Sequence, residues 1–155
     1  MERENERTIP DQMLENVVGG MEMPVGSYIW PVPSFRAVTI TFTEPCEGGF
    51  YGGIFISGPG IFGAAVVAAD SGTVSLDGYG SGGWGGGYGT YCQIDHDGGR
   101  STLYAHLSTL TVFPGQVVSQ GQLIGFVGAT GDTGCPGLRF ETRINGIRVD
   151  PMGEL

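Results

Sequence analysis

The chain has 155 residues, a length that leaves room for one domain with a hydrophobic core. Its formal net charge is −9, and it contains no lysine. No apolar run approaches the length of about 20 residues that a membrane-spanning helix needs, and the negative charge argues against nucleic acid as a partner. We therefore expect neither membrane insertion nor nucleic-acid binding. Thirty glycines and nine prolines, spread between short apolar runs, are typical of a β domain with many tight turns.

Residues 1–20 differ in composition from the rest of the chain. They are charged and contain no glycine before Gly19 and Gly20, and their apolar residues are spaced as on a helix: Ile9, Leu14 and Val17. This pattern resembles the double-glycine leaders of exported peptides, which a transporter-linked protease cuts after the second glycine. Two glycines let the backbone enter a narrow protease cleft that a side chain would block.

We therefore expect residues 1–20 to be a leader, either a short helix or disordered, that an export transporter removes. Residues 21–28 are then a linker, and the mature protein is secreted and extracellular. The alternative is a disordered tail in which Gly19 and Gly20 are only a flexible joint.

From residue 29 onward the sequence predicts short strands separated by turns. Alternating apolar and polar residues or short apolar runs, bounded by glycine-rich turns, mark six strands: 38–43, 64–69, 90–95, 101–106, 122–127 and 138–144. Residues 96–99 (HDGG) are typical of a hairpin turn. No segment after the leader has a helical period. The expected fold is all-β, an antiparallel sandwich or part-open barrel over residues 29–155.

The segment 78–89 (GYGSGGWGGGYG) is too rich in glycine to hold regular structure for long. Its aromatic residues Tyr79, Trp84 and Tyr88 offer surfaces on which a glycan or peptide could stack. The segment is therefore either a flexible rim loop or one wall of a binding groove.

Several segments in chain order resemble the lysostaphin/LytM-type zinc metallopeptidases, which hydrolyse peptidoglycan. Among them are 30–33 (WPVP), 68–74 (AADSGTV), 104–108 (YAHLS), 128–131 (GATG) and 138–141 (LRFE). The resemblance covers nearly all of the chain after the linker, and it implies the same β fold.

The resemblance also implies a zinc site, and there the chain departs from the family pattern. Active members hold zinc through a His and an Asp four residues apart and through the second His of a His-x-His pair, with an open position for water. Here the three ligand positions align with Tyr51, Phe55 and Arg139, and one catalytic histidine position aligns with Gly137. Of the family's active-site residues only His106 is retained. We therefore expect neither zinc nor another cofactor.

A shifted alignment does not restore the zinc site, because the only histidines are His96 and His106, in the middle of the chain. We expect His96 to be solvated at its turn, and His106 to be either a structural hydrogen-bonding residue or a remnant catalytic residue. Arg139 could pair with Glu141 on the same strand face, or with a carboxylate of a bound partner.

The three cysteines, Cys46, Cys92 and Cys135, form no CxxC pair. Either one disulfide and a free thiol or three buried thiols fit this spacing. Because Cys135 precedes the aligned catalytic position by two residues, a Cys–His nucleophile pair or an unusual zinc site with His106 stays open.

Three functions follow from these observations. The first is a secreted, catalytically inactive domain that binds the bacterial cell wall, through its peptidoglycan, or a partner such as a cell-wall hydrolase. The second is an active zinc endopeptidase that cleaves peptidoglycan cross-bridges through non-standard ligands. The third is a bacteriocin-like exported effector, which the leader suggests and the domain does not.

Overall fold

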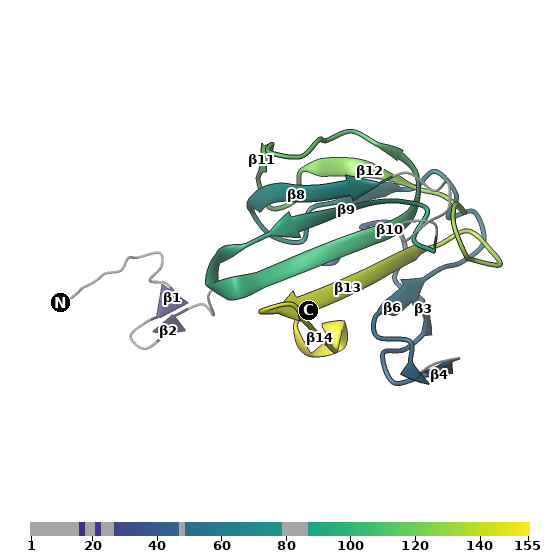
Figure 1. The fold of residues 1–155 in the computed structure, drawn as a ribbon, viewed down its shortest axis with the longest axis horizontal. Coiled ribbons are helices and arrows are strands. Elements are labelled where there is room, and N and C mark those ends of the chain that lie inside the picture. Colours follow the sequence, from purple (N-terminus) through teal and green to yellow (C-terminus); the bar gives the residue numbers. More distant parts are fainter. Residues whose placement is uncertain (1–15, 18–20, 23–26, 47–48, 79–86) are drawn as a thin grey trace.

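The computed structural model describes residues 16–17, 21–22, 27–46, 49–78 and 87–155. Within them the chain forms one large antiparallel sheet and two small strand pairs, and no α-helix occurs in this part of the chain (Figure 1). The prediction of an all-β antiparallel fold is therefore confirmed.

The large sheet contains ten short strands. Their bounds are β3 (Val38–Ile40), β6 (Ile54–Ile56), β7 (Ala65–Val67), β8 (Gly72–Gly78), β9 (Thr90–Asp95), β10 (Arg100–Leu110), β11 (Val117–Val118), β12 (Leu123–Val127), β13 (Leu138–Ile144) and β14 (Ile147–Val149). Two short 3₁₀ turns span Asp97–Gly99 and Pro151–Gly153.

The small pairs are β1 (Asn16–Val17) with β2 (Met21–Glu22), and β4 (Pro45–Cys46) with β5 (Gly49–Phe50). Most of the expected leader lies outside the described residues, and so do its Gly19 and Gly20. The helix expected there therefore stays a prediction. Tyr79 and Trp84 of the glycine-rich segment also lie outside the described residues.

The longest strand, β10, organises the sheet because it changes partners along its length. On one side it pairs with β9 as far as Leu107, and on the other its pairing with β13 ends at Ala105 opposite Arg139. From Leu107 onward it pairs with β12 instead, and β12 in turn pairs with β7. This change of partner folds the sheet back on itself, so that β12 lies over the other strands (Figure 1). The result is a part-open barrel.

The core lies between the folded halves of this sheet. Its largest fully buried apolar side chains come from β6, β9, β10, β12 and β13 and from the loop before β7: Tyr104, Phe140, Ile54, Ile56, Ile61, Ile94, Leu107, Ile124 and Leu138. Leu138, Phe140 and Thr142 of β13 are buried, whereas on the other face Arg139 and Arg143 are half-buried and Glu141 between these two is fully buried. Because side chains alternate across a strand, the apolar face of β13 meets the core and its charged face is left for the other side of the sheet.

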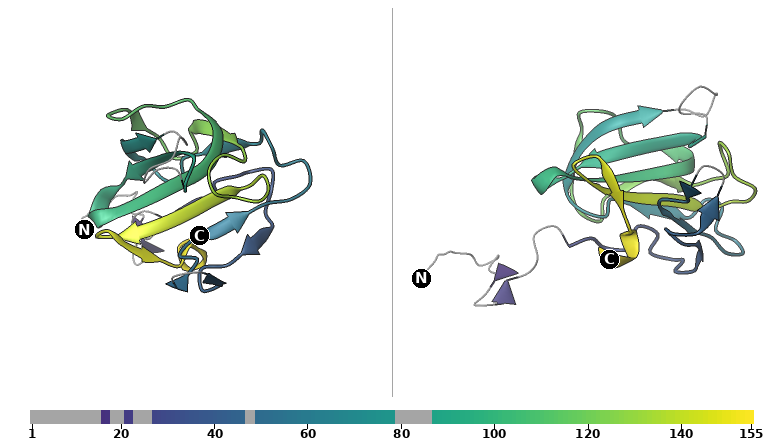
Figure 2. Two further views of the ribbon diagram at one scale, coloured as in Figure 1. Left: turned by 45° about the vertical axis from the view of Figure 1, so that its right-hand side comes forward. Right: turned by 60° about the horizontal axis from the view of Figure 1, so that its bottom comes forward.

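The chain ends next to this charged face. A turn at Asn145 and Gly146 reverses the chain, and β14 pairs back along β13 with Arg148 opposite Arg143. The Pro151–Gly153 turn then lies beside the hairpin (Figure 2). This return brings a second arginine-bearing strand to the charged face of β13.

Candidate functional site

A groove of about 800 Å³ lies where β10 changes partners. Its walls come from β3, β6, β10, β13, β14, the β4–β5 pair and two loops. The lining residues are Ile40, Cys46, Phe50, Tyr51, Phe55, Gly87, Tyr88, His106, Asp132, Thr133, Gly134, Cys135, Arg139 and Arg148. Seven residues named in the sequence analysis are among them: Cys46, Tyr51, Phe55, Tyr88, His106, Cys135 and Arg139.

His106 lies at the bulge of β10, between the two stretches of regular pairing. It is 4% exposed and has a φ of +65°, a backbone conformation that few non-glycine residues adopt. Its N–H donates to the carbonyl of Tyr88 at 2.7 Å, and its Nδ1 lies 2.8 Å from the carbonyl of Thr130. Since a carbonyl can only accept, Nδ1 carries the proton of the neutral ring. Burial lowers the pKa of His106, against the opposing effect of the Thr130 carbonyl.

Two glycine turns hold His106 in this position. Gly89 and Gly131 both have positive φ, and a Cβ on either residue would overlap with the backbone of the other turn. The close approach lets the Thr130 hydroxyl accept from the N–H of Thr90 at 3.0 Å and donate to the carbonyl of Leu107 at 2.7 Å. These glycines are therefore required by the contact between the turns that fixes the imidazole.

Arg139 lies on the groove face of β13, directly opposite Phe55 of β6. Its Nε donates to Glu141 Oε2 at 2.7 Å and its Nη2 donates to the carbonyl of Tyr51 at 2.7 Å. The guanidinium also stacks over the Tyr51 ring, with 4.1 Å between its carbon and the ring centroid. The pairing with Glu141 expected from the strand pattern is therefore present.

Phe55 occupies the space beside Gly137. A Cβ on Gly137 would overlap with the Phe55 ring, so a larger residue at 137 requires Phe55 to move. The same ring lies edge-on to the His106 imidazole, with 6.1 Å between centroids. The Phe55 ring therefore fills the space that the missing side chain of Gly137 leaves.

Glu141 is the charged centre of the site, and sequence reasoning noted it only as a partner for Arg139. Its side chain is fully buried, and it accepts from Arg139, from Arg143 at 2.6 Å and from the Tyr88 hydroxyl at 2.9 Å. Arg148 approaches to 3.9 Å. Burial alone would raise the pKa of Glu141, but the neighbouring arginines hold it below its usual value. The Arg-x-Glu-x-Arg pattern of β13 was the signal for this cluster, which we call the Glu141 cluster (Glu141, Arg139, Arg143 and Arg148).

The residues at the aligned zinc positions do not fit a zinc ion. Phe55 carries no donor atom, Arg139 is a cation, and burial raises the pKa of the Tyr51 phenol, which keeps it protonated. The nearby carboxylate of Glu141 is already engaged by arginines. Across the described residues, no group of three or more His, Cys, Asp and Glu side chains is placed to hold a metal ion.

The cysteines differ from both arrangements expected from the sequence. All three are free thiols, and only Cys92 is buried, where desolvation raises its pKa to about 12. Cys46 and Cys135 are exposed and line the groove. Cys46 lies at the end of β4 and Cys135 in the loop before β13, a placement that residue spacing alone does not encode.

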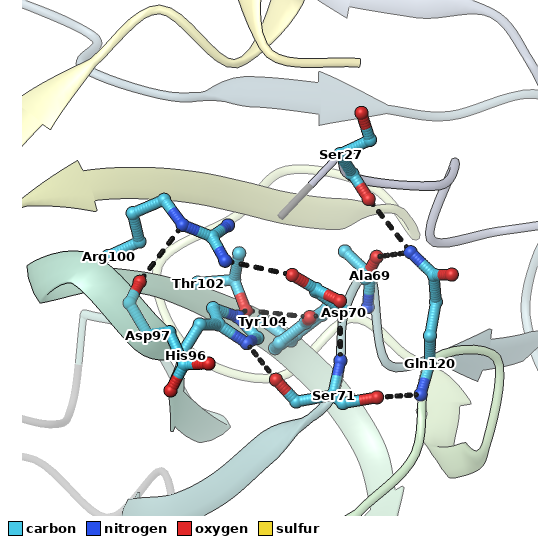
Figure 3. A network of polar contacts seen from close by, with 10 residues as sticks. All are labelled: Ser27, Ala69, Asp70, Ser71, His96, Asp97, Arg100, Thr102, Tyr104 and Gln120. Carbon is cyan, nitrogen blue, oxygen red and sulfur yellow. Dashed lines mark hydrogen bonds and ion pairs between the residues drawn. The ribbon is translucent and has the colours of Figure 1, made fainter. Parts of the chain in front are cut away.

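His96 is not solvated as expected. It lies outside the groove, in a network that joins β9, β10 and the turn before β8 (Figure 3). Its Nδ1 donates to the carbonyl of Ser71 at 2.7 Å, and its Nε2 accepts from the Thr102 hydroxyl at 2.9 Å. The Thr102 oxygen lies 2.7 Å from the hydroxyl of Tyr104. His96 thus links the turn at Ser71 to Thr102 and Tyr104 of β10. Burial lowers the pKa of His96.

The fold is an antiparallel all-β domain with a groove at the β10 bulge. Residues 49–151 match the family described as peptidase family M23, and the chain belongs to this family. The lysostaphin/LytM-type resemblance seen in the sequence is thereby confirmed.

Two curated relatives illustrate the match. The DD-carboxypeptidase/endopeptidase Mpg of Neisseria meningitidis serogroup B is 49% identical over 67 residues, which is 43% of this chain and 15% of that protein. The lipoprotein YgeR of Escherichia coli K12 is 34% identical over 129 residues, 83% of this chain and 48% of that protein. The chain thus spans less than half of each of these relatives.

Solved structures agree with this assignment. A zinc-containing peptidase from Vibrio cholerae superposes with a TM-score of 0.72 at 29% identity, over 86% of this chain and 41% of that chain. The catalytic domain of lysostaphin from Staphylococcus simulans gives a TM-score of 0.64 at 26% identity, over 79% of this chain and 92% of that chain.

Proposed function

We propose that this chain is a non-hydrolytic M23-family domain that binds peptidoglycan in its groove. The observation that carries the proposal is the guanidinium of Arg139, held by Glu141 and by the Tyr51 carbonyl at an aligned zinc-ligand position. A fixed cation at this place repels a metal ion and offers no water activated for attack. The groove remains, because its shape depends on the sheet and its loops and not on a metal.

Relatives support a cell-wall ligand. One matching protein is named a DD-carboxypeptidase/endopeptidase, and another, from Vibrio cholerae, is named a peptidoglycan DD-endopeptidase. The groove of this chain has aromatic walls in Phe50, Tyr51 and Tyr88, which suit stacking on a glycan or peptide. The volume of about 800 Å³ is in the range of small-ligand sites.

We also propose that the protein works outside the cytoplasm after removal of residues 1–20. The composition of this segment and its terminal Gly19-Gly20 support export by a double-glycine transporter. A relative named as a lipoprotein is consistent with an envelope location. Among the described residues, no helix has the length and apolar character needed to cross a bilayer.

The experiment is a sedimentation assay of the full chain with purified peptidoglycan sacculi, combined with chromatography of released fragments. We expect the chain to sediment with the sacculi and to release no fragments, whereas an active M23 peptidase in parallel releases them. Fragment release that a chelator abolishes would support instead an active endopeptidase with non-standard ligands.

A pair of matched variants locates the binding surface. Phe50 lines the groove and is 65% exposed, and Phe113 is 64% exposed and does not line it. Phe50→Ala should weaken sedimentation about tenfold, because a stacked aromatic surface is worth on the order of 1 kcal/mol or more. Phe113→Ala should sediment like the unmodified chain. Equal binding by both variants would place the wall ligand elsewhere.

A further inference from the structure

The Glu141 cluster leaves positive charge in excess at the groove. Three guanidinium groups surround one carboxylate, which gives two uncompensated positive charges. The whole chain carries a net charge of −9, so this concentration of arginines stands out against its surroundings. Of the groove-lining side chains, Asp132 is the one that carries a negative charge at neutral pH.

The three arginines are not equally available to a ligand. Arg139 and Arg143 donate to Glu141 at 2.7 and 2.6 Å, and their side chains are 11% and 24% exposed. Arg148 is 45% exposed and lies 3.9 Å from Glu141, beyond hydrogen-bond distance. Arg148 is therefore the arginine whose donors can reach a molecule in the groove.

The backbone at Gly52 leaves room for the Arg148 side chain. A Cβ on Gly52 would lie 2.8 Å from Arg148 Nη1, and Gly52 has a φ of +78° that favours glycine. The guanidinium thus lies directly over the chain at Gly52, next to Tyr51. A planar group in this position presents its remaining donors as a fork, the geometry that matches a carboxylate.

We infer that the groove contains a binding site for the carboxylate of a short peptide, formed by Arg148 with Arg139 behind it. This inference rests on the proposed function and names the chemical group of the ligand. Phe50 and Tyr88 supply apolar walls for the adjoining peptide side chains. The negative charge of the whole chain disfavours long polyanions but leaves a single carboxylate free to pair locally.

The test is isothermal titration of the full chain with N-acetyl-alanyl-alanine as the free acid, as its C-terminal amide, and with inorganic phosphate. We expect the free acid to bind at least tenfold more tightly than the amide or phosphate. Equal affinity for acid and amide would overturn the carboxylate site, and so would phosphate binding as tightly as the peptide. This comparison uses the unmodified protein, so it does not depend on whether a variant folds.

Two variants assign the effect to the groove. Arg148→Gln should reduce affinity for the free acid about tenfold, to that of the amide. Arg36→Gln is the matched control, because Arg36 stacks over Trp30 and does not line the groove. Wild-type affinity in Arg148→Gln would overturn the inference.

The sacculus assay separates this inference from the proposed function. If Arg148→Gln and the unmodified chain sediment alike and acid and amide do not differ, the wall-binding proposal stands and the carboxylate site falls. If the free acid binds through Arg148 and sacculi do not bind, the carboxylate site stands and peptidoglycan as the ligand falls.

Discussion

At the residue scale, Glu141 contributes most to the electrostatics of the groove. Its fully buried carboxylate is satisfied by two arginines within 2.7 Å and by the Tyr88 hydroxyl. Removing one partner of such a buried pair leaves the others charged and unpaired. The arrangement is stable only as a complete set.

Glu141→Gln should therefore lower the free energy of unfolding by about 3–5 kcal/mol, because Arg139 and Arg143 lose their counter-charge inside the protein. Urea denaturation at neutral pH measures this loss. The control is Glu44→Gln, an exposed site that should change stability by less than about 0.5 kcal/mol. Similar small losses for both variants would show that the cluster contributes little to stability.

His96 makes stability depend on pH. In its neutral form Nε2 accepts from Thr102, which frees the Thr102 oxygen to accept from the buried Tyr104 hydroxyl. A protonated ring would donate at Nε2, so that the proton of either Thr102 or Tyr104 is left without an acceptor in this chain of groups. Asp70, Asp95 and Arg100 are the charges that act on the ring, and burial remains the largest influence, lowering its pKa.

The sign of the effect follows from this lowered pKa. The unfolded chain binds a proton at His96 at higher pH than the native chain does, so its contribution is full above pH about 6.5 and is lost as the pH falls below it. The loss is at most about 1.4 kcal/mol per pH unit for one histidine. His106, whose pKa is also lowered, acts in the same direction.

We expect His96→Gln to flatten the fall in unfolding free energy between pH 7.5 and 5.5, measured by urea denaturation at both values. His106→Asn should remove the other part of the slope, since asparagine tolerates the positive φ at that position. An unchanged slope in His96→Gln would mean that the network does not require the neutral ring.

At the scale of elements, β6 and β13 fit together through Phe55 and Gly137. Gly137→Ala should cost about 1–3 kcal/mol, because the added methyl overlaps with the Phe55 ring and the core must shift. In a Phe55→Ala background the same change should cost clearly less, and the remaining cost comes from the Ile56 carbonyl, which would lie 2.8 Å from the added methyl. A double-mutant cycle by denaturation measures this coupling, and additive losses would contradict the contact.

Strands with clear alternation could be predicted from the sequence. The ranges 90–95 and 138–144 coincide with β9 and β13. β6 was missed because Ile54–Ile56 is short and buried on both faces, so it shows no alternation. The bulge of β10 depends on a change of partner from β13 to β12, which is a property of the folded sheet and not of local sequence.

For the site too, some residues could be predicted from the sequence and others depend on how the sheet folds. Family resemblance predicted that Tyr51, Phe55, Arg139 and His106 belong to one site, and all four line the groove. The position of Arg148 in the groove could not be predicted, because it depends on β14 returning along β13.

At the scale of the whole molecule, export experiments test whether residues 1–20 are a leader that is removed. In the organism that makes the chain, we expect the protein recovered from the medium to begin at Met21. Changing both Gly19 and Gly20 to Leu should leave the chain uncut, because the side chains block the narrow protease cleft, whereas Val18→Leu should still be cut. Intact mass spectrometry distinguishes the two lengths, and secreted full-length chain would contradict the leader.

We propose that a cationic cluster takes the place of the zinc site in this M23-family domain. The most direct test saturates the full chain with zinc, dialyses it exhaustively, and measures metal per chain by mass spectrometry. We expect almost no retained zinc, because Arg139 and Glu141 neutralise each other where donors would be needed. One tightly held zinc per chain would contradict it and would make an active endopeptidase the leading function.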